Sequence, residues 1–288
     1  MPVRDDLGIR MKTYYEQIPK TKLMRRTPVM IRIDGKAFHT FTKGFQKPFD
    51  TILIKSMQET TKYLCENIQG CVLGYTQSDE ITLVLVDYQN FETAAWFDYE
   101  VQKMCSIAAS MATMSFNRFF ARGVDAFAER LEADEINEAE NEKNKLLCTY
   151  RKAVEKGAMF DARVFNIPKE EVTNCIYWRQ LDASRNSVQM VGQANFTQKE
   201  LQNKTCSNIQ DMLMEQKGIN WNDFPIYQKR GTCVVKELYL PGDSAGEEIR
   251  KNGETQYRTR WKIDTEIPIF KGEVREYIEK LVMLEAKE

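Results

Sequence analysis

The stretch Met30-Ile-Arg-Ile-Asp-Gly-Lys-Ala-Phe-His39 decides the fold that this sequence predicts. A short, β-branched and largely apolar run over residues 29–33 stops abruptly at Asp34 and Gly35, which is typical of a strand that ends at the rim of a sheet. Gly35 lets the backbone turn there and come close to a ligand. We therefore expect this strand to deliver the Asp34 carboxylate into a crevice.

A second acid, Asp79, lies in Gly74-Tyr-Thr-Gln-Ser-Asp-Glu80, between apolar runs at residues 71–75 and 81–86. This pattern predicts a β-hairpin with Asp79 at its tip. Between Asp34 and the hairpin, residues 51–68 carry apolar side chains at helical spacing, with Asp50 or Thr51 as the cap. The chain therefore predicts strand, helix, strand, tight turn and strand in that order.

This order brings the two acids together. A helical crossover makes the first two strands parallel. If the third strand inserts between them, antiparallel to both, Asp34 and Asp79 meet at one edge. Two carboxylates there make a hard oxygen site that suits Mg²⁺. Taken singly, each segment also has a structural interpretation, because Asp-Gly is a turn dipeptide and Ser-Asp-Glu suits a solvated loop.

Six motifs, in this order, resemble those of the tRNA(His) guanylyltransferase family, over roughly residues 25–235. They are Arg32-Ile-Asp-Gly-Lys-Ala-Phe-His39, Lys47-Pro-Phe-Asp50, Gln77-Ser-Asp-Glu80, Phe160-Asp-Ala-Arg163, Trp178-Arg-Gln-Leu-Asp182 and Lys229-Arg-Gly-Thr232. The resemblance implies an enzyme that adds nucleotides to the 5′ end of tRNA, opposite in direction to ordinary polymerases. It also implies a palm-like catalytic domain, two metal ions, ATP and GTP or another NTP as substrates, and a homotetramer.

The resemblance assigns roles to individual residues. Asp34 and Asp79 would be catalytic and would hold two Mg²⁺ ions together with Gly35. The nucleotide-binding residues would be Lys36, Ala37, Phe38, His39, Lys47, Asp50, Ser78, Glu80 and Lys103. We expect His39 to orient its loop and not to do chemistry, and Lys103 could equally be a surface lysine.

A tRNA partner needs cations, and several segments supply them. Arginine and asparagine can grip phosphates or base edges, and the candidate RNA-binding residues are Arg179, Arg185, Asn186, Lys229 and Arg230. Lys20 to Arg26 and residues 258–262 are further basic stretches that could instead be a solvated face and an edge strand. The formal net charge of the chain is −1, so RNA binding would require a local basic patch.

One segment departs from the tRNA(His)-specific members of the family. Those members carry His-Ile-Asn-Asn after the tryptophan motif, whereas this chain has Ser184-Arg-Asn-Ser187. The departure is similar to the branch called guanylyltransferase-like proteins, which repair 5′-truncated tRNAs by templated addition. We therefore predict tRNA 5′-end repair, with tRNA(His) guanylyl transfer proper as an alternative.

Two further alternatives come from other classes. A palm-type nucleotide cyclase would use the same sheet edge, although the hairpin lacks a Gly-Gly-Asp/Glu-Glu-Phe turn. A non-catalytic RNA-binding module with a similar sheet would need paired aromatic residues on its strands, which the sequence does not place there. Cyclic products, or RNA binding indifferent to Mg²⁺ and NTP, would support these readings.

The rest of the chain suggests an α+β protein with a ferredoxin-like β-α-β-β-α-β core. We predict a catalytic domain at residues 1–236 and a C-terminal extension at 237–288 with a turn at Pro241-Gly-Asp243. Further predictions are a leading helix within 1–27, a helix at 92–120, a helical or mobile insertion at 123–157 and a strand at 159–167 with a buried Asp161–Arg163 pair. Helices at 168–180 and 200–217 and a strand at 227–236 follow.

Seven cysteines without a Cys-x-x-Cys pair indicate reduced thiols and a cytoplasmic protein. A single histidine argues against a zinc or histidine-based catalytic site. The charged N-terminus predicts no signal peptide, and the lack of a long apolar run predicts no membrane partner.

Overall fold

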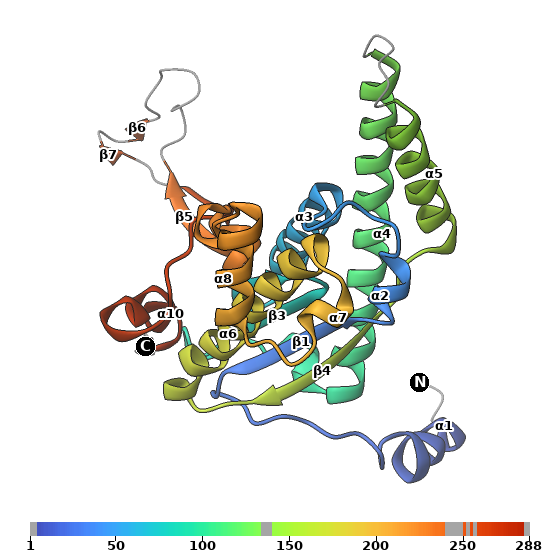
Figure 1. Ribbon diagram of the computed structural model, residues 1–288. Helices are drawn as coiled ribbons and strands as arrows, with labels where there is room; N and C mark the ends of the chain where they lie inside the picture. The colour runs from blue at the N-terminus through green and yellow to red at the C-terminus, as the bar shows by residue number, and fades with distance from the viewer. Residues whose placement is uncertain (1–4, 134–139, 240–249, 252–253, 256–257, 285–288) are drawn as a thin grey trace.

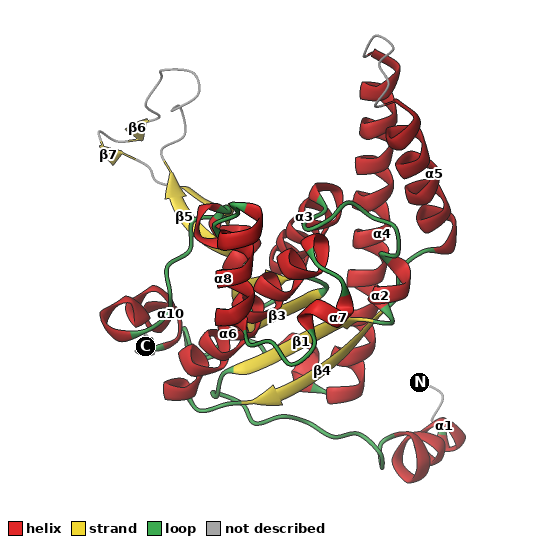
Figure 2. Cartoon of the chain, in the orientation of Figure 1, coloured by secondary structure: helices red, strands yellow, loops and turns green. Residues whose placement is uncertain are grey.

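The computed structural model describes residues 5–133, 140–239, 250–251, 254–255 and 258–284. Its centre is an antiparallel six-stranded sheet in the order β4-β1-β3-β2-β5-β8. The strands are β1 (Val29–Gly35), β2 (Cys71–Gln77), β3 (Glu80–Leu85), β4 (Phe160–Asn166), β5 (Thr232–Tyr239) and β8 (Arg258–Asp264). The predicted α+β class is confirmed, and Figure 2 shows the strands surrounded by helices.

The predicted β-α-β-β-α-β order is confirmed by β1, α3 (Thr51–Asn67), β2, β3, α4 (Val101–Ala133) and β4. Strand β3 lies between β1 and β2 and is antiparallel to both, as expected. Helix α3 starts where predicted, because the Asp50 side chain accepts a hydrogen bond from the Leu53 N–H, 2.9 Å away. The crossover and the hairpin therefore bring the ends of β1 and β2 to one edge of the sheet.

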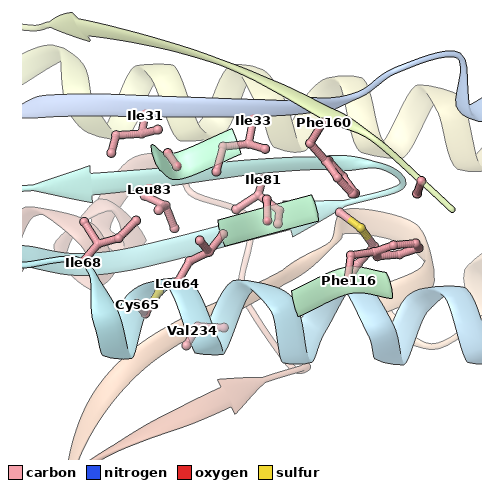
Figure 3. Close-up of a cluster of buried hydrophobic side chains, with 14 of the residues drawn as sticks. Ile31, Ile33, Leu64, Cys65, Ile68, Ile81, Leu83, Phe116, Phe160 and Val234 are labelled. Atoms are coloured by element: carbon pink, nitrogen blue, oxygen red, sulfur yellow. The ribbon is translucent and has the colours of Figure 1, made fainter. Parts of the chain in front are cut away.

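Helices α3 and α4 cover one face of the sheet. Alternate residues of the central strands point into this layer, and Figure 3 shows Ile31, Ile33, Ile81 and Leu83 facing Leu64 and Phe116. Burying one such side chain contributes about 1.5–3 kcal/mol. Because side chains alternate along a strand, the same register sends Arg32 and Asp34 to the opposite face.

The opposite face is covered by α6 (Lys169–Asn195) and α10 (Glu276–Val282), which bury Met30 and Val84 against Val172, Ile176 and Ile278. Helix α8 (Cys206–Lys217) packs on the second half of α6, with Val188 and Leu213 in a separate cluster. The structure thus has helical layers on both faces, and the end of β1 lies beside α6.

The region 123–157 is formed by the end of α4 and by α5 (Glu140–Lys156), which project together beyond the sheet (Figure 1). Tyr150 of α5 packs against Phe45, Phe120 and Phe127 with ring centroids 5.0–6.2 Å apart. The base of this helical pair is therefore joined to the loop that follows β1.

Several predicted boundaries were wrong. The helix predicted at 92–120 starts at Val101, after a short 3₁₀ turn at Trp96–Tyr99. The helix predicted to end at 180 runs to Asn195, so the Ser184–Ser187 segment is helical. The predicted 200–217 helix is divided into α7 (Gln198–Leu201) and α8, each started by a threonine capping box.

The strand predicted at 227–236 begins later, because residues 226–230 form the short helix α9 (Ile226–Arg230) before β5. Strand β5 crosses the predicted domain boundary at 236/237 and pairs with β8 in the same sheet. Residues 258–262 therefore belong to an edge strand. Strands β6 (Arg250–Lys251) and β7 (Glu254–Thr255) form a separate pair, and the turn predicted at 241–243 lies outside the described residues.

At the N-terminus, the predicted leading helix is limited to α1 (Asp6–Met11) and the adjoining helical turn Lys12–Glu16, which bury no side chain. The remaining short helical elements are α2 (Phe38–Phe41) and 3₁₀ turns at Trp221–Asp223 and Gly272–Arg275. Within the described ranges, no helix is both long enough and apolar enough to cross a membrane.

Candidate active site

Asp34 and Asp79 come from two elements that meet at one edge of the sheet. Asp34 ends β1 opposite Glu80 of β3, and the Gly35 N–H donates a hydrogen bond to the carbonyl oxygen of Asp79, 3.1 Å away. Gly35 is required here because an added Cβ would lie 2.2 Å from the Phe38 ring. The hairpin tip is thereby fixed beside the end of β1.

Burial and neighbouring acids raise the proton affinity of both carboxylates. Burial raises the pKa of Asp34 above its ordinary value, and the charges of Glu80 and Asp161 raise it further. Burial also raises the pKa of Asp79, and the charge of Asp34 adds to this rise. The edge therefore concentrates negative charge that a bound cation would neutralise.

The donor set suits Mg²⁺ as that ion is usually bound in proteins. In the part of the chain that is described, no three His, Cys, Asp or Glu side chains gather to hold a metal alone. Mg²⁺ commonly takes only one or two carboxylates and completes its octahedron with waters and substrate phosphates. Asp34, Asp79 and the Gly35 carbonyl could therefore hold it together with a triphosphate.

Glu80 was predicted to bind nucleotide and Arg179 to bind RNA, but the structure buries them against each other. Arg179 donates from Nε to Glu80 Oε1 at 2.6 Å and from Nη2 to Glu80 Oε2 at 2.8 Å. Arg32 adds a contact at 3.1 Å, and Asp182 holds Arg179 from the other side. One internal ion-pair network uses both groups, which argues against the predicted ligand roles.

A cleft of about 670 Å³ opens beside this edge, between the loop that follows β1, the hairpin tip and the second half of α6. The predicted site residues that line it are Gly35, Ala37, Phe38, His39, Lys47, Asp50, Ser78 and Asp79. Lys43, Met190 and Gln193 also line it. The structure thus brings most of the predicted nucleotide-binding residues to one cavity.

The loop backbone is held in a defined shape. Ala37 and Ser78 adopt the left-handed conformation, with φ values of 53° and 50°, which is uncommon for non-glycine residues. Phe38 anchors the loop by packing against Phe41, Phe116 and Phe160 with centroids 5.1–5.5 Å apart. The Lys36 N–H donates to Met159 O at 2.8 Å, and its side chain is exposed.

Asp50 and His39 occupy the cleft wall in different ways. The buried Asp50 carboxylate caps α3 and also accepts hydrogen bonds from the Gln46 N–H at 3.1 Å and the Tyr150 hydroxyl at 2.6 Å. Asp50 is therefore engaged by the fold and shapes the loop. His39 is exposed, with Nε2 3.0 Å from the hydroxyl of Thr40.

Lys103 is not brought to the cleft. It lies at the start of α4, with Nζ 4.7 Å from the centroid of the Phe97 ring. Helix α4 reaches the active-site end of β4 only at Thr113, whose hydroxyl accepts from the Phe160 N–H at 3.1 Å. Ten helical residues separate the two positions by about 15 Å, so Lys103 belongs to the opposite end of the sheet.

The candidate RNA-binding residues are also divided. Lys229 is buried, and its ammonium group donates to the Asn222 carbonyl, which argues against the predicted RNA contact. Arg230 is partly buried on the same short helix. Arg185 and Asn186 are exposed on α6, and Arg185 is paired with Asp182. Of the five candidate RNA-binding residues, only Arg185 and Asn186 are exposed to solvent beside the active-site edge.

Other charged groups serve the fold. Within the Lys20–Arg26 stretch, Lys22 pairs with Asp98, and Arg25 Nε lies 2.5 Å from the buried carboxylate of Asp87. The Asp161–Arg163 pair, predicted to be buried, is a 3.2 Å contact on the exposed edge strand β4. An edge strand has no neighbour on its outer side, which explains that exposure.

Sequence reasoning missed Met190 and Gln193. They follow Asn186 at helical spacings of four and three residues, and all three lie on one stripe of α6. This signal was present, but it required a helix that continues past residue 180.

The sequence and the fold resemble those of known proteins. A family model described as Thg1, tRNAHis guanylyltransferase, matches residues 9–168. A bacterial tRNA(His) guanylyltransferase (Thg1)-like protein in complex with ATP is 41% identical and superposes with a TM-score of 0.74, over 97% of this chain and 100% of that one. A bacterial Thg1-like protein in complex with GTP is 39% identical over the same shares, with a TM-score of 0.72.

A more distant relative is uncharacterized protein R259 of Acanthamoeba polyphaga mimivirus. It is 28% identical over 246 residues, which cover 82% of this chain and 79% of that protein.

Proposed function

The chain belongs to the tRNA(His) guanylyltransferase family and is a nucleotidyltransferase, and from this premise we propose that it adds nucleotides to the 5′ end of tRNA. The reaction would proceed in the 3′–5′ direction and would be template-dependent, so that it repairs truncated tRNAs. The observation that carries this proposal is a cleft large enough for a nucleoside triphosphate, lined by Asp79 and by Gly35, the residue that follows Asp34 in β1.

The cleft supplies the groups that a triphosphate needs. Lys43 and Lys47 line it, and the backbone of residues 35–39 turns beside the acids. Phosphates prefer such cations together with backbone N–H groups. Two Mg²⁺ ions held by Asp34, Asp79 and the Gly35 carbonyl would neutralise charge on the phosphate oxygens. The likeness to Thg1-like proteins in complex with ATP and GTP supports both nucleotides as substrates.

The chemistry consists of two phosphoryl transfers. An oxygen of the tRNA 5′-monophosphate attacks the α-phosphorus of ATP, which forms an adenylylated 5′ end and releases pyrophosphate. The 3′-hydroxyl of an incoming NTP then attacks the activated 5′ phosphorus, and AMP leaves. Such transfers depend mainly on positioning and charge neutralisation, so the exposed His39 need not act as a base.

The repair assignment rests on the Ser184–Ser187 segment. Ser187 is buried and donates to the Ser184 carbonyl at 2.8 Å, while Ser184 donates to Gln180 at 3.1 Å. Both serines are therefore used inside α6, and only Arg185 and Asn186 face solvent. A Watson–Crick template can select the nucleotide by base-pair geometry, so the protein needs only to hold backbone and phosphate.

The test compares full-length tRNA(His) with several 5′-truncated tRNAs, using labelled RNA, ATP and each NTP in turn, resolved on a gel. We expect extension of the truncated tRNAs with the nucleotide that pairs with the opposite strand. Strong preference for full-length tRNA(His), with guanosine added opposite any base, would instead favour tRNA(His) guanylyl transfer. The expected homotetramer and cytoplasmic location stay predictions, which light scattering and cell fractionation would check.

A further inference from the structure

An exposed tryptophan lies beside the catalytic edge and has no part in the proposed chemistry. Trp178 is on α6, and 51% of its surface is exposed to solvent. Leu181, one helical turn further along, is also 51% exposed. Large apolar side chains exposed together at the edge of a site are typical of a binding surface.

Two guanidinium groups fix the tryptophan ring. The Arg179 Cζ lies 4.4 Å from the ring centroid, and the Arg32 Cζ lies 5.4 Å from it. Both arginines bind the carboxylate of Glu80, which is paired with Asp34 in the strand register. The ring is therefore held in place by the same buried network that abuts the catalytic acid, and the exposed part of its surface is preorganised for a ligand.

The tryptophan is on a different side of α6 from the nucleotide cleft. Asn186, Met190 and Gln193 line the cleft side, whereas Trp178, Leu181 and Arg185 follow a neighbouring stripe at spacings of three and four residues. On the sheet, Arg163 of β4 is opposite Arg32 in the register, so it belongs to the same face as Asp34. The nucleotide cleft therefore lies on one side of the catalytic edge, and the surface that carries Trp178 lies on the other.

We propose that Trp178, Leu181, Arg163 and Arg185, here called the Trp178 surface, bind the terminal nucleotide at the 5′ end of the RNA. This inference rests on the proposed function. The terminal base would stack on the exposed side of the indole, and the two arginines would contact the adjoining phosphates. Trp178 is then a positioning residue that places the reactive 5′ phosphate between the tryptophan and the triphosphate cleft.

The charged groups of the Trp178 surface favour RNA as its ligand over a small molecule the size of a nucleotide. Arg163 and Arg185 are exposed, and among the described residues their ion-pair partners are the nearby acids Asp161 and Asp182. Exposed pairs of this kind contribute little to stability, so phosphate can replace the acid. Stacking on an aromatic ring is also indifferent to sequence, because every base has a π-face. That property suits an enzyme whose terminal base changes from one tRNA to the next.

The test uses a 5′-truncated tRNA with 2-aminopurine as its terminal nucleotide and no NTP. Stacking quenches this base, so wild-type protein should quench it, Trp178→Phe should retain most of the quenching, and Trp178→Leu should abolish it. Affinity for the RNA should fall about tenfold in Trp178→Leu, within the range for losing one stacked base. Met214→Ala on α8, which also removes an exposed apolar side chain, is the matched control.

A second RNA gives a comparison made on wild-type protein alone, so its outcome does not depend on whether the variants fold. The same tRNA with an abasic 5′ terminus should bind wild-type protein about tenfold more weakly than the base-bearing tRNA. Equal affinity for the two RNAs, or full quenching by Trp178→Leu, would overturn the proposal. Nucleotide addition by wild-type protein is measured separately, so failure of the proposed function is distinguished from failure of the Trp178 surface.

Discussion

Asp79 and Glu80 are neighbours in the sequence, and the structure gives them opposite tasks. Glu80 is buried and receives hydrogen bonds from two arginines, so its charge is compensated inside the protein. In the part of the chain that is described, the Asp79 carboxylate accepts one side-chain hydrogen bond, from the Ser78 hydroxyl, while burial and the charge of another acid, Asp34, raise its pKa. The comparison teaches that missing compensation, and not acidity alone, distinguishes the acid that we propose binds a cation and substrate.

The largest expected effect tests the uncompensated acids. Asp34→Ala and Asp79→Ala should each abolish nucleotide addition, because losing one ligand of a two-metal clamp costs on the order of several kcal/mol in the transition state. Single-turnover assays at saturating Mg²⁺ measure the loss, and circular dichroism checks that the fold is retained. Near-normal turnover in either variant would remove the site assignment.

The compensated acid should behave differently. Glu80→Gln removes the acid that binds Arg179 through two hydrogen bonds and leaves Asp182 as its remaining acidic partner, so the free energy of unfolding should fall by about 1.5–3 kcal/mol. Urea denaturation of the Mg²⁺-free protein measures this. Asp79→Asn is the matched control, because it changes the adjacent residue and should not destabilise the protein. Equal destabilisation by both variants would contradict the comparison.

The pH dependence sharpens the contrast. Folding raises the pKa of Asp34 and Asp79 above their unfolded values, so each contributes stability below the unfolded pKa of about 4 that is lost as the pH rises through the folded value. At neutral pH, Asp34→Asn and Asp79→Asn should therefore raise the melting temperature of the Mg²⁺-free protein. The gain should vanish near pH 3. Mg²⁺ should stabilise the wild type and not these variants.

The smallest expected effect concerns the exposed cation beside the network. Arg185→Ala should weaken binding of many truncated tRNAs alike and should reduce the slope of log affinity against log salt by about one unit. Filter binding over a range of salt concentrations measures the slope. Lys229→Ala is the contrasting variant. Because the Lys229 side chain is buried, this substitution should leave the slope unchanged. An unaltered slope in Arg185→Ala would exclude a phosphate contact at that residue.

The sequence by itself determined the sheet core and the meeting of Asp34 with Asp79. An apolar run that ends in Asp-Gly, a capped helix and a tight hairpin allow essentially one right-handed arrangement, and that arrangement places both acids at one edge. Local sequence patterns of this kind predict the structure correctly because they depend on residues that are close together in the chain. The antiparallel insertion of β3 was a condition of that arrangement, and the structure confirms it.

Only the tertiary structure decided which charged side chains are exposed to solvent and which are buried against partners inside the protein. Glu80, Arg179 and Lys229 look like ligands in the sequence, yet the structure buries all three. Glu80 and Arg179 pair across 99 residues of sequence. Lys229 donates to the carbonyl of Asn222, which is near in sequence but lies outside its short helix. Lys103 was misplaced because the length and start of α4 set its distance from the edge. The contact between Trp178 and Arg32, on which the proposed Trp178 surface depends, also joins residues whose spacing in the sequence does not predict it. Compensation of charge is a property of three-dimensional neighbours, so a linear pattern cannot assign it.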